Sequence, residues 1–90
     1  MEIVYSPKAI KDRDFWKKSG NLSIMEKISS LLISIEKAPY KGMGRPEPLK
    51  HRLSGMWSSR ISKEHRLIYE FNDETKVVTV HSLRRSLLKL

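Results

Sequence analysis

The pattern of hydrophobic and polar positions predicts two helices in the first half of the chain. In the second of them, apolar side chains recur every three or four positions, at Ile24, Ile28, Leu31, Leu32 and Ile35. This spacing places them along one side of an α-helix, which ends near residues 37–38 because Pro39 cannot continue it. An earlier helix is predicted to begin at Pro7, after Ser6 as N-cap, and to end near residue 18, before Ser19 and Gly20.

Strand patterns occupy the first five residues and most of the second half. Residues 56–61, 65–71 and 76–83 alternate in polarity or are rich in β-branched side chains, and short polar breaks separate them. Residues 40–48 hold two glycines and two prolines and predict a loop. The order predicts one α+β domain, residues 1–90, with two helices packed on one face of a twisted antiparallel sheet and an open face opposite.

Charge narrows the class of partner. Eighteen Lys and Arg against ten Asp and Glu leave a net charge of +8, which favours a polyanion such as nucleic acid or an acidic protein. Residues 41–66 hold seven basic and two acidic side chains, a net +5 of that total. This stretch is either a solvated surface or a groove that follows phosphates. Trp57 and Tyr69 either stack on bases or belong to the core.

Several kinds of chemistry are excluded. A chain of 90 residues buries a single small core and leaves no space for a deep cofactor site. It has no cysteine, and its three histidines are too far apart for a local zinc motif, so we expect no metal and no cofactor. We see neither a signal peptide nor an apolar run of membrane-spanning length, and therefore expect a cytoplasmic protein with no membrane partner.

One carboxylate stands out among the basic residues. Glu47 lies between Pro46 and Pro48, in a stretch that is otherwise basic from residue 41 to residue 52. The two prolines restrict the backbone, and nearby cations favour an ionised carboxylate. A fixed, ionised carboxylate among phosphate-binding cations is what a general base for a ribose 2′-hydroxyl requires. The alternative is an acidic side chain that only offsets local positive charge.

Three sequence blocks carry a family resemblance: residues 44–50 (GRPEPLK), 53–58 (LSGMWS) and 64–69 (EHRLIY). They are similar to the YoeB/Txe toxins of the RelE/ParE superfamily of bacterial toxin–antitoxin systems, and the resemblance extends from the first strand to about residue 83. It implies a RelE-like fold and a ribosome-dependent, metal-independent endoribonuclease. Such an enzyme cuts mRNA in the ribosomal A site by attack of the 2′-oxygen on the adjacent phosphorus.

The resemblance also assigns residues and partners. It makes Glu47 the general base and Arg66 the cation that stabilises the charged phosphorane. Residues expected to contact RNA or the ribosome are Arg45, Lys50, His51, Arg52, Arg60 and Arg84. The implied partners are a YefM-like antitoxin with an acidic segment, the 70S ribosome and mRNA. Homodimers are common in the family.

The C-terminal segment, residues 84–90, departs from the family, which ends with a basic residue, a spacer and His-Tyr. Matching Arg84 to the basic residue places Ser86 and Leu87 at the His and Tyr positions, whereas an ungapped count places Arg84 and Arg85 there. Neither alignment supplies the general acid. His81 is the nearest imidazole. In a regular strand it points to the opposite face from Ser86, unless a β-bulge changes its direction.

We therefore predict that cleavage is weak or absent, because loss of a general acid typically costs about 10²–10⁴-fold in rate. Two other functions stay open because one fold supports several activities. The first is a ParE-like toxin that inhibits gyrase by protein contact. The second is a catalytically inactive module that binds the antitoxin or the ribosome.

Overall fold

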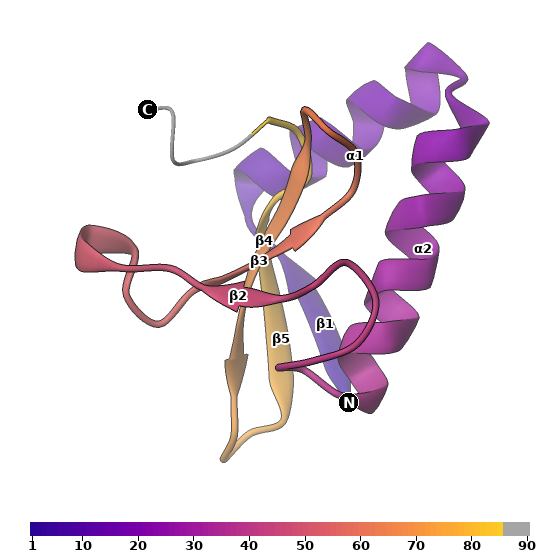
Figure 1. Cartoon of the computed structure of the whole chain (residues 1–90). Coiled ribbons are helices and arrows are strands. Elements are labelled where there is room, and N and C mark those ends of the chain that lie inside the picture. Colours follow the sequence, from indigo (N-terminus) through magenta and orange to yellow (C-terminus); the bar gives the residue numbers. More distant parts are fainter. Residues whose placement is uncertain (86–90) are drawn as a thin grey trace.

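The computed structural model describes residues 1–85, which form a helical layer against a five-stranded sheet (Figure 1). Strand β1 (Glu2–Tyr5) leads into helices α1 (Pro7–Ser19) and α2 (Leu22–Lys37). A loop then leads to β2 (Glu47–Pro48), the 3₁₀ turn η1 (His51–Leu53) and β3 (Trp57–Arg60), followed by β4 (Arg66–Asn72) and β5 (Val77–Ser82). The α+β class is confirmed.

Both helices begin at side-chain caps. The N–H of Ala9 donates to Ser6 Oγ at 3.1 Å, so α1 starts where the sequence predicts. The N–H of Ile24 donates to Asn21 Oδ1 at 3.1 Å, and this cap makes α2 begin at Leu22, earlier than its apolar stripe. Gly20, with φ of 69°, ends α1 in the left-handed conformation that glycine favours.

The strands are ordered β1-β5-β4-β3-β2. All neighbours are antiparallel except β1 and β5, which run parallel with Ile3 opposite Val78. The prediction of an entirely antiparallel sheet is therefore wrong at this edge. The reason is topological: parallel strands need a long crossover connection, and the helices and strands between β1 and β5 provide one. Residues 47–48, predicted as loop, form the short strand β2 at the other edge.

The core lies between α2 and the middle of the sheet. Leu31 and Ile35 of α2 meet Leu67 and Tyr69 of β4, and all four are essentially inaccessible to solvent. The Tyr69 hydroxyl donates to the Pro39 carbonyl. Tyr69 therefore belongs to the core and offers no surface to a base. Because side chains alternate along a strand, Arg66, Ile68 and Glu70 of β4 point to the opposite side, called here the outer face.

The pairing of β5 with β4 contains a register shift. Ile68 pairs with Ser82, and Tyr69 pairs with Val80, so His81 is an extra residue between two consecutive pairs. This is the arrangement of a β-bulge, which redirects side chains at the point of insertion. The alternation predicted for residues 76–83 nevertheless continues through Ser82, which is buried like Val78 and Val80, and ends at Leu83, which is also buried.

Candidate active site

Glu47 is held in place by the loop that precedes it. Gly44 packs so closely that a Cβ atom would lie 2.6 Å from Leu31 Cδ2, and its φ of +82° is one that other residues rarely adopt. The Gly44 carbonyl accepts a hydrogen bond from the Arg60 N–H at 2.9 Å. On the other side of Glu47, the Leu49 N–H donates to the Met56 carbonyl at 2.9 Å. The loop is thus attached to the fold both before and after Glu47.

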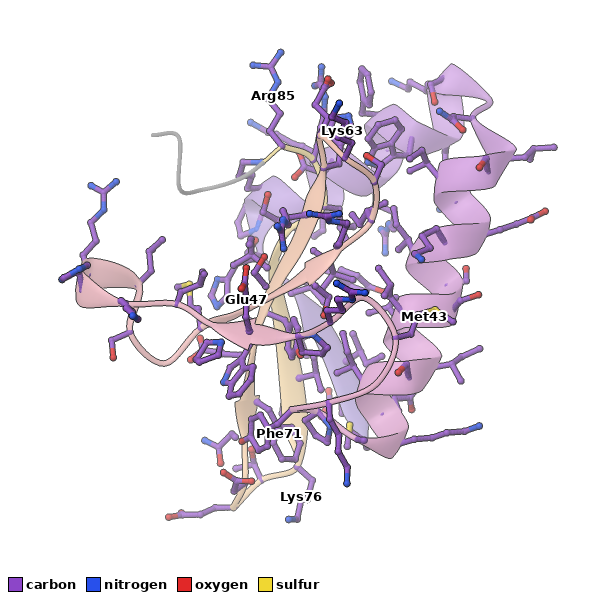
Figure 2. All side chains as sticks on the ribbon, in the orientation of Figure 1. Met43, Glu47, Lys63, Phe71, Lys76 and Arg85 are labelled. Carbon is purple, nitrogen blue, oxygen red and sulfur yellow. The ribbon has the colours of Figure 1, made fainter. Side chains whose placement is uncertain are left out.

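The two residues assigned to catalysis lie in contact. Arg66 Nη1 is 3.4 Å from Glu47 Oε1 and 3.4 Å from Ser58 Oγ. Glu47 pairs with Ser58 across β2 and β3, and Ser58 pairs with Ile68 of β4. Glu47 is 56% exposed and Arg66 is 24% exposed, so an RNA backbone has access to both. Figure 2 shows Glu47 on β2, where it crosses in front of β4 and β5.

Ser58 joins this group although the sequence analysis did not identify it. Its residue is 1% exposed, and its hydroxyl contacts Arg66 on the outer face. The only signal in the sequence was its position beside Trp57 in the block of residues 53–58. Its role depends on the register between β2 and β3, which no local pattern specifies.

Three of the predicted RNA-binding residues, Arg60, Arg45 and Lys50, lie near this pair in the strand register or along the chain. Arg60 lies directly opposite Arg66 in the β3–β4 register, so two guanidinium groups come from adjacent strands. Arg45 and Lys50 are exposed on the two sides of Glu47 in the chain. His51 and Arg52 are exposed in η1, within the loop between β2 and β3 that projects from the sheet (Figure 1). The arrangement offers phosphates several cations around a single carboxylate.

Arg84 is separated from this group. Its guanidinium carbon lies 3.6 Å from the centre of the Phe15 ring on α1, in a cation–π contact. This contact directs Arg84 toward the helical layer rather than toward Glu47. The structure therefore does not bring Arg84 together with the other predicted RNA-binding residues.

Hydrogen bonds to α1 hold the chain where it leaves β5. The Leu83 N–H donates to Asp12 Oδ2 at 2.9 Å, and Trp16 Nε1 donates to the Leu83 carbonyl at 2.9 Å. The Arg85 N–H then donates to His65 Nδ1 at 2.8 Å. Figure 2 shows Arg85 at the end of the sheet where β4 begins. Residues 83–85 thus run alongside the start of β4, whereas Ser86 and Leu87 lie outside the described residues.

His81 lies on the outer face beside Glu70. Its Nε2 atom is 2.7 Å from Glu70 Oε1. Glu70 is four residues from Arg66 along β4, a span of roughly 13 Å. Within residues 1–85, no cluster of three His, Asp or Glu side chains is arranged to hold a metal ion. In the same part of the chain, neither helix has the length and apolar character needed to cross a bilayer.

Comparison with known proteins identifies the family. The model of the YoeB-like toxin of bacterial type II toxin–antitoxin systems matches residues 5–85. This chain belongs to that family. Toxin YoeB of Escherichia coli K12 is 38% identical to this YoeB-like toxin over 78 residues, which cover 87% of this chain and 92% of the relative.

Solved structures of YoeB proteins have the same fold. A YoeB/ParE toxin from Agrobacterium tumefaciens superimposes on this YoeB-like toxin with a TM-score of 0.91 and 32% identity, covering 96% of this chain and 99% of the other. A YoeB–YefM complex from Staphylococcus aureus contains a chain with a TM-score of 0.85 and 34% identity, covering 96% of this chain and 97% of the other. A YoeB dimer from that organism is also known.

Proposed function

We propose that this YoeB-like toxin is a ribosome-dependent endoribonuclease that cuts mRNA in the A site without a metal ion. The observation that carries the proposal is the contact of Glu47 with Arg66, at 3.4 Å, with Arg60 opposite Arg66 on the neighbouring strand. An exposed base next to a cation suits the transfer of a phosphoryl group within RNA. In that reaction a proton must leave the 2′-hydroxyl while negative charge builds up on phosphorus.

Each group has a defined task in the proposed reaction. Glu47 accepts the proton of the ribose 2′-hydroxyl, and the 2′-oxygen attacks the adjacent phosphorus. Arg66 stabilises the charge that develops on the phosphorane, and Ser58 keeps the guanidinium in place through the Nη1–Oγ contact. Arg60, Arg45 and Lys50 hold the RNA backbone on either side. The 5′-oxygen leaves, and a 2′,3′-cyclic phosphate remains.

The partners follow from family membership and charge. The S. aureus relative forms a complex with the antitoxin YefM, and an acidic YefM-like antitoxin suits a chain with a net charge of +8. The same charge suits the ribosomal RNA around the A site. We further propose that the toxin acts in the cytoplasm, where ribosomes and mRNA are found, and that it forms homodimers as its S. aureus relative does.

The sequence after residue 84 favours a second candidate, a weakened or catalytically inactive toxin. Neither Ser86 and Leu87 nor Arg84 and Arg85 can act as the general acid that the family places near its C-terminus. In that case the protein binds the antitoxin and the ribosome and cuts slowly or not at all. Inhibition of gyrase by protein contact is a further alternative on the same fold.

One experiment separates these functions. An mRNA is translated in vitro with the purified toxin, and cuts are mapped by primer extension. The unchanged chain is compared with Glu47→Ala and with two repaired chains, Ser86→His/Leu87→Tyr and Arg84→His/Arg85→Tyr. We expect A-site cuts that are weak in the unchanged chain, stronger in one repaired chain and absent in Glu47→Ala. Lack of cuts in all chains, together with inhibition of gyrase supercoiling at low toxin concentration, would overturn the proposal.

A further inference from the structure

A histidine–carboxylate pair lies on the outer face, and the reaction described above does not use it. His81 Nε2 and Glu70 Oε1 are 2.7 Å apart. Their side chains are 23% and 49% exposed, so the pair is partly sheltered and still accessible to a ligand. A carboxylate hydrogen-bonded to one imidazole nitrogen orients the ring and determines which nitrogen faces the other way.

Alternation along β5 places His81 on this face. Val78 and Val80 are buried in the core, so Thr79 and His81 point to the opposite side, where Glu70 pairs with Thr79. The contact of His81 with Glu70 gives the direction of the ring, because Glu70 shares the outer face with Arg66. The backbone at this point is fixed by Ser6, whose Oγ donates to the His81 carbonyl at 3.0 Å.

The order of the strands puts Arg66 between Glu47 and His81. Glu47 belongs to β2, Arg66 to β4 and His81 to β5, and the strands lie in the order β2-β3-β4-β5. Neighbouring strands are about 4.8 Å apart, so roughly 14 Å separate the backbones that carry Glu47 and His81. A phosphodiester fits between two side chains that stand on backbones this far apart.

We propose that the His81–Glu70 pair delivers the proton to the leaving 5′-oxygen when this toxin cuts RNA. The proposal rests on the endoribonuclease function proposed above. It concerns the chain as it stands, with serine and leucine at positions 86 and 87. His81 is the proton donor, and Glu70 is a positioning residue that acts through His81. The pair accounts for the cleavage that remains without a C-terminal histidine.

The proton balance closes with groups that the chain already contains. Glu47 takes the proton of the 2′-hydroxyl, the bond between the 2′-oxygen and phosphorus forms, and the bond between phosphorus and the 5′-oxygen breaks. His81 gives its Nδ1 proton to the 5′-oxygen while its Nε2–H stays hydrogen-bonded to Glu70. The products are a 2′,3′-cyclic phosphate and a 5′-hydroxyl. Exchange with water removes the proton from Glu47 and restores the one on His81.

The test uses a leaving group that needs no proton. The cut site is first mapped on ribosome-bound mRNA. Two versions of that RNA are then made, one with the natural phosphodiester and one with sulfur in place of the bridging 5′-oxygen. A thiolate leaves without protonation because thiols are far more acidic than alcohols. Cleavage of both RNAs is measured with the unchanged chain and with His81→Gln, Glu70→Ala and Glu70→Gln. Thr79→Ser and Glu74→Gln are matched controls on β5 and on the β4–β5 turn.

We expect His81→Gln to slow cleavage of the natural RNA by about 10²-fold, a typical loss for general acid catalysis. It should leave cleavage of the sulfur-containing RNA nearly unchanged. Glu70→Ala should show the same selective loss to a smaller extent, and Glu70→Gln should recover part of it because its side-chain oxygen still accepts a hydrogen bond. The control variants should match the unchanged chain, and thermal unfolding should show that all variants are folded.

Four results would overturn the proposal, each in a recognisable way. An equal loss on both RNAs would mean that His81 supports binding or folding instead of proton transfer. Undiminished cleavage by His81→Gln, or cleavage only by a repaired C-terminal segment, would leave the endoribonuclease function standing without the His81–Glu70 pair. Lack of cleavage by the unchanged and repaired chains alike would remove the endoribonuclease function itself and the proposal with it. Because Glu70 is half exposed, its variants test the idea even if His81→Gln unfolds.

Discussion

The backbone N–H of Arg66 donates a hydrogen bond to the carbonyl of Arg85 at 3.3 Å. Arg66 therefore contacts Glu47 through its side chain and holds Arg85, the last described residue, through its backbone. Arg85 has a φ of 63°, an uncommon conformation for a residue with a side chain, and its N–H is bound by His65. The position of Arg85 is thus set by His65 and by Arg66, the first residue of β4.

Asp12 is expected to be the main anchor of this segment. It is 6% exposed and accepts hydrogen bonds from the Leu83 N–H at 2.9 Å and from Lys8 Nζ at 2.8 Å. Asp12→Ala leaves the buried Leu83 N–H without a partner and should lower the free energy of unfolding by about 1–3 kcal/mol in urea titrations. Asp12→Asn keeps an acceptor oxygen and should lose clearly less. Equal losses for both variants would show that the hydrogen bond to Leu83 contributes little.

Glu47 and Arg66 should be required for cleavage and dispensable for folding. Glu47→Gln removes the base and should slow cleavage of translated mRNA by about 10²–10⁴-fold. Arg66→Ala should slow it by about 10²–10³-fold through loss of charge stabilisation. Because Glu47 is mostly exposed, the melting temperature of Glu47→Gln should stay close to that of the unchanged chain. If either substitution abolished the thermal transition, that residue would belong to the structural core instead.

Gly44 should be intolerant of any side chain. A Cβ at this position would lie 2.6 Å from Leu31 Cδ2 and 3.1 Å from Ser59 Cβ, so Gly44→Ala must push the loop outward. We expect a loss of about 1–3 kcal/mol in the free energy of unfolding, and slower cleavage because Glu47 moves with the loop. Gly55→Ala is the matched control, since Gly55 also has a positive φ but nothing lies within 4 Å of its added Cβ. A similar loss for both variants would mean that backbone strain alone is responsible.

Stability at alkaline pH should depend on Tyr69. Burial raises the pKa of Tyr69 above its ordinary value of 10.0, so the folded state favours the neutral phenol. This contribution is fully present below pH 10 and is lost as the pH rises through the raised pKa. Tyr69→Phe lacks the hydrogen bond to Pro39, so it should be about 1 kcal/mol less stable at neutral pH and should lose less stability on going to alkaline pH.

Tyr40→Phe is the control variant for Tyr69→Phe. Partial desolvation, followed by the hydrogen bond and the charge of Asp73, also raises the pKa of Tyr40, but Tyr40 is 40% exposed. Its substitution should therefore change the pH dependence of unfolding less than Tyr69→Phe does. The measurement is chemical unfolding at several pH values between neutral and strongly alkaline. Parallel pH curves for Tyr69→Phe and the unchanged chain would contradict the assignment.

Ribosome binding should weaken steeply with added salt. Each phosphate that Arg45, Lys50 or Arg60 neutralises releases counterions, so the logarithm of the affinity falls in proportion to the logarithm of the salt concentration. Lys50→Ala should reduce the magnitude of this slope by about 1, because it removes one cation that neutralises a phosphate. Arg84→Ala, by contrast, should leave the slope unchanged, since Arg84 lies over Phe15 of α1. A flat salt response of the unchanged chain would rule out an electrostatic groove.

The sequence predicted those features that depend on local periodicity and failed on those that depend on register. The stripe of α2 predicted Leu31 and Ile35 in the core because helical spacing is a local property. The parallel pairing of β1 with β5 was missed because it joins distant segments, and β2 because two residues carry no periodic signal. Glu47 could be predicted as a site residue from the two prolines that flank it. Ser58 could not be predicted, because only the strand register brings it to Arg66.

The parallel edge of the sheet has a consequence for how the protein forms. Strand β1 is synthesised well before its partner β5, which follows more than seventy residues later, with Glu2 opposite Val77. Pairings this distant in sequence slow folding because a long loop must close before any contact forms. The hydrogen bonds of Asp12 and Trp16 with Leu83 likewise form only after Leu83 has been synthesised. The sheet is therefore completed only after β5 has been synthesised, and a nascent chain that stops before β5 lacks the partner of β1.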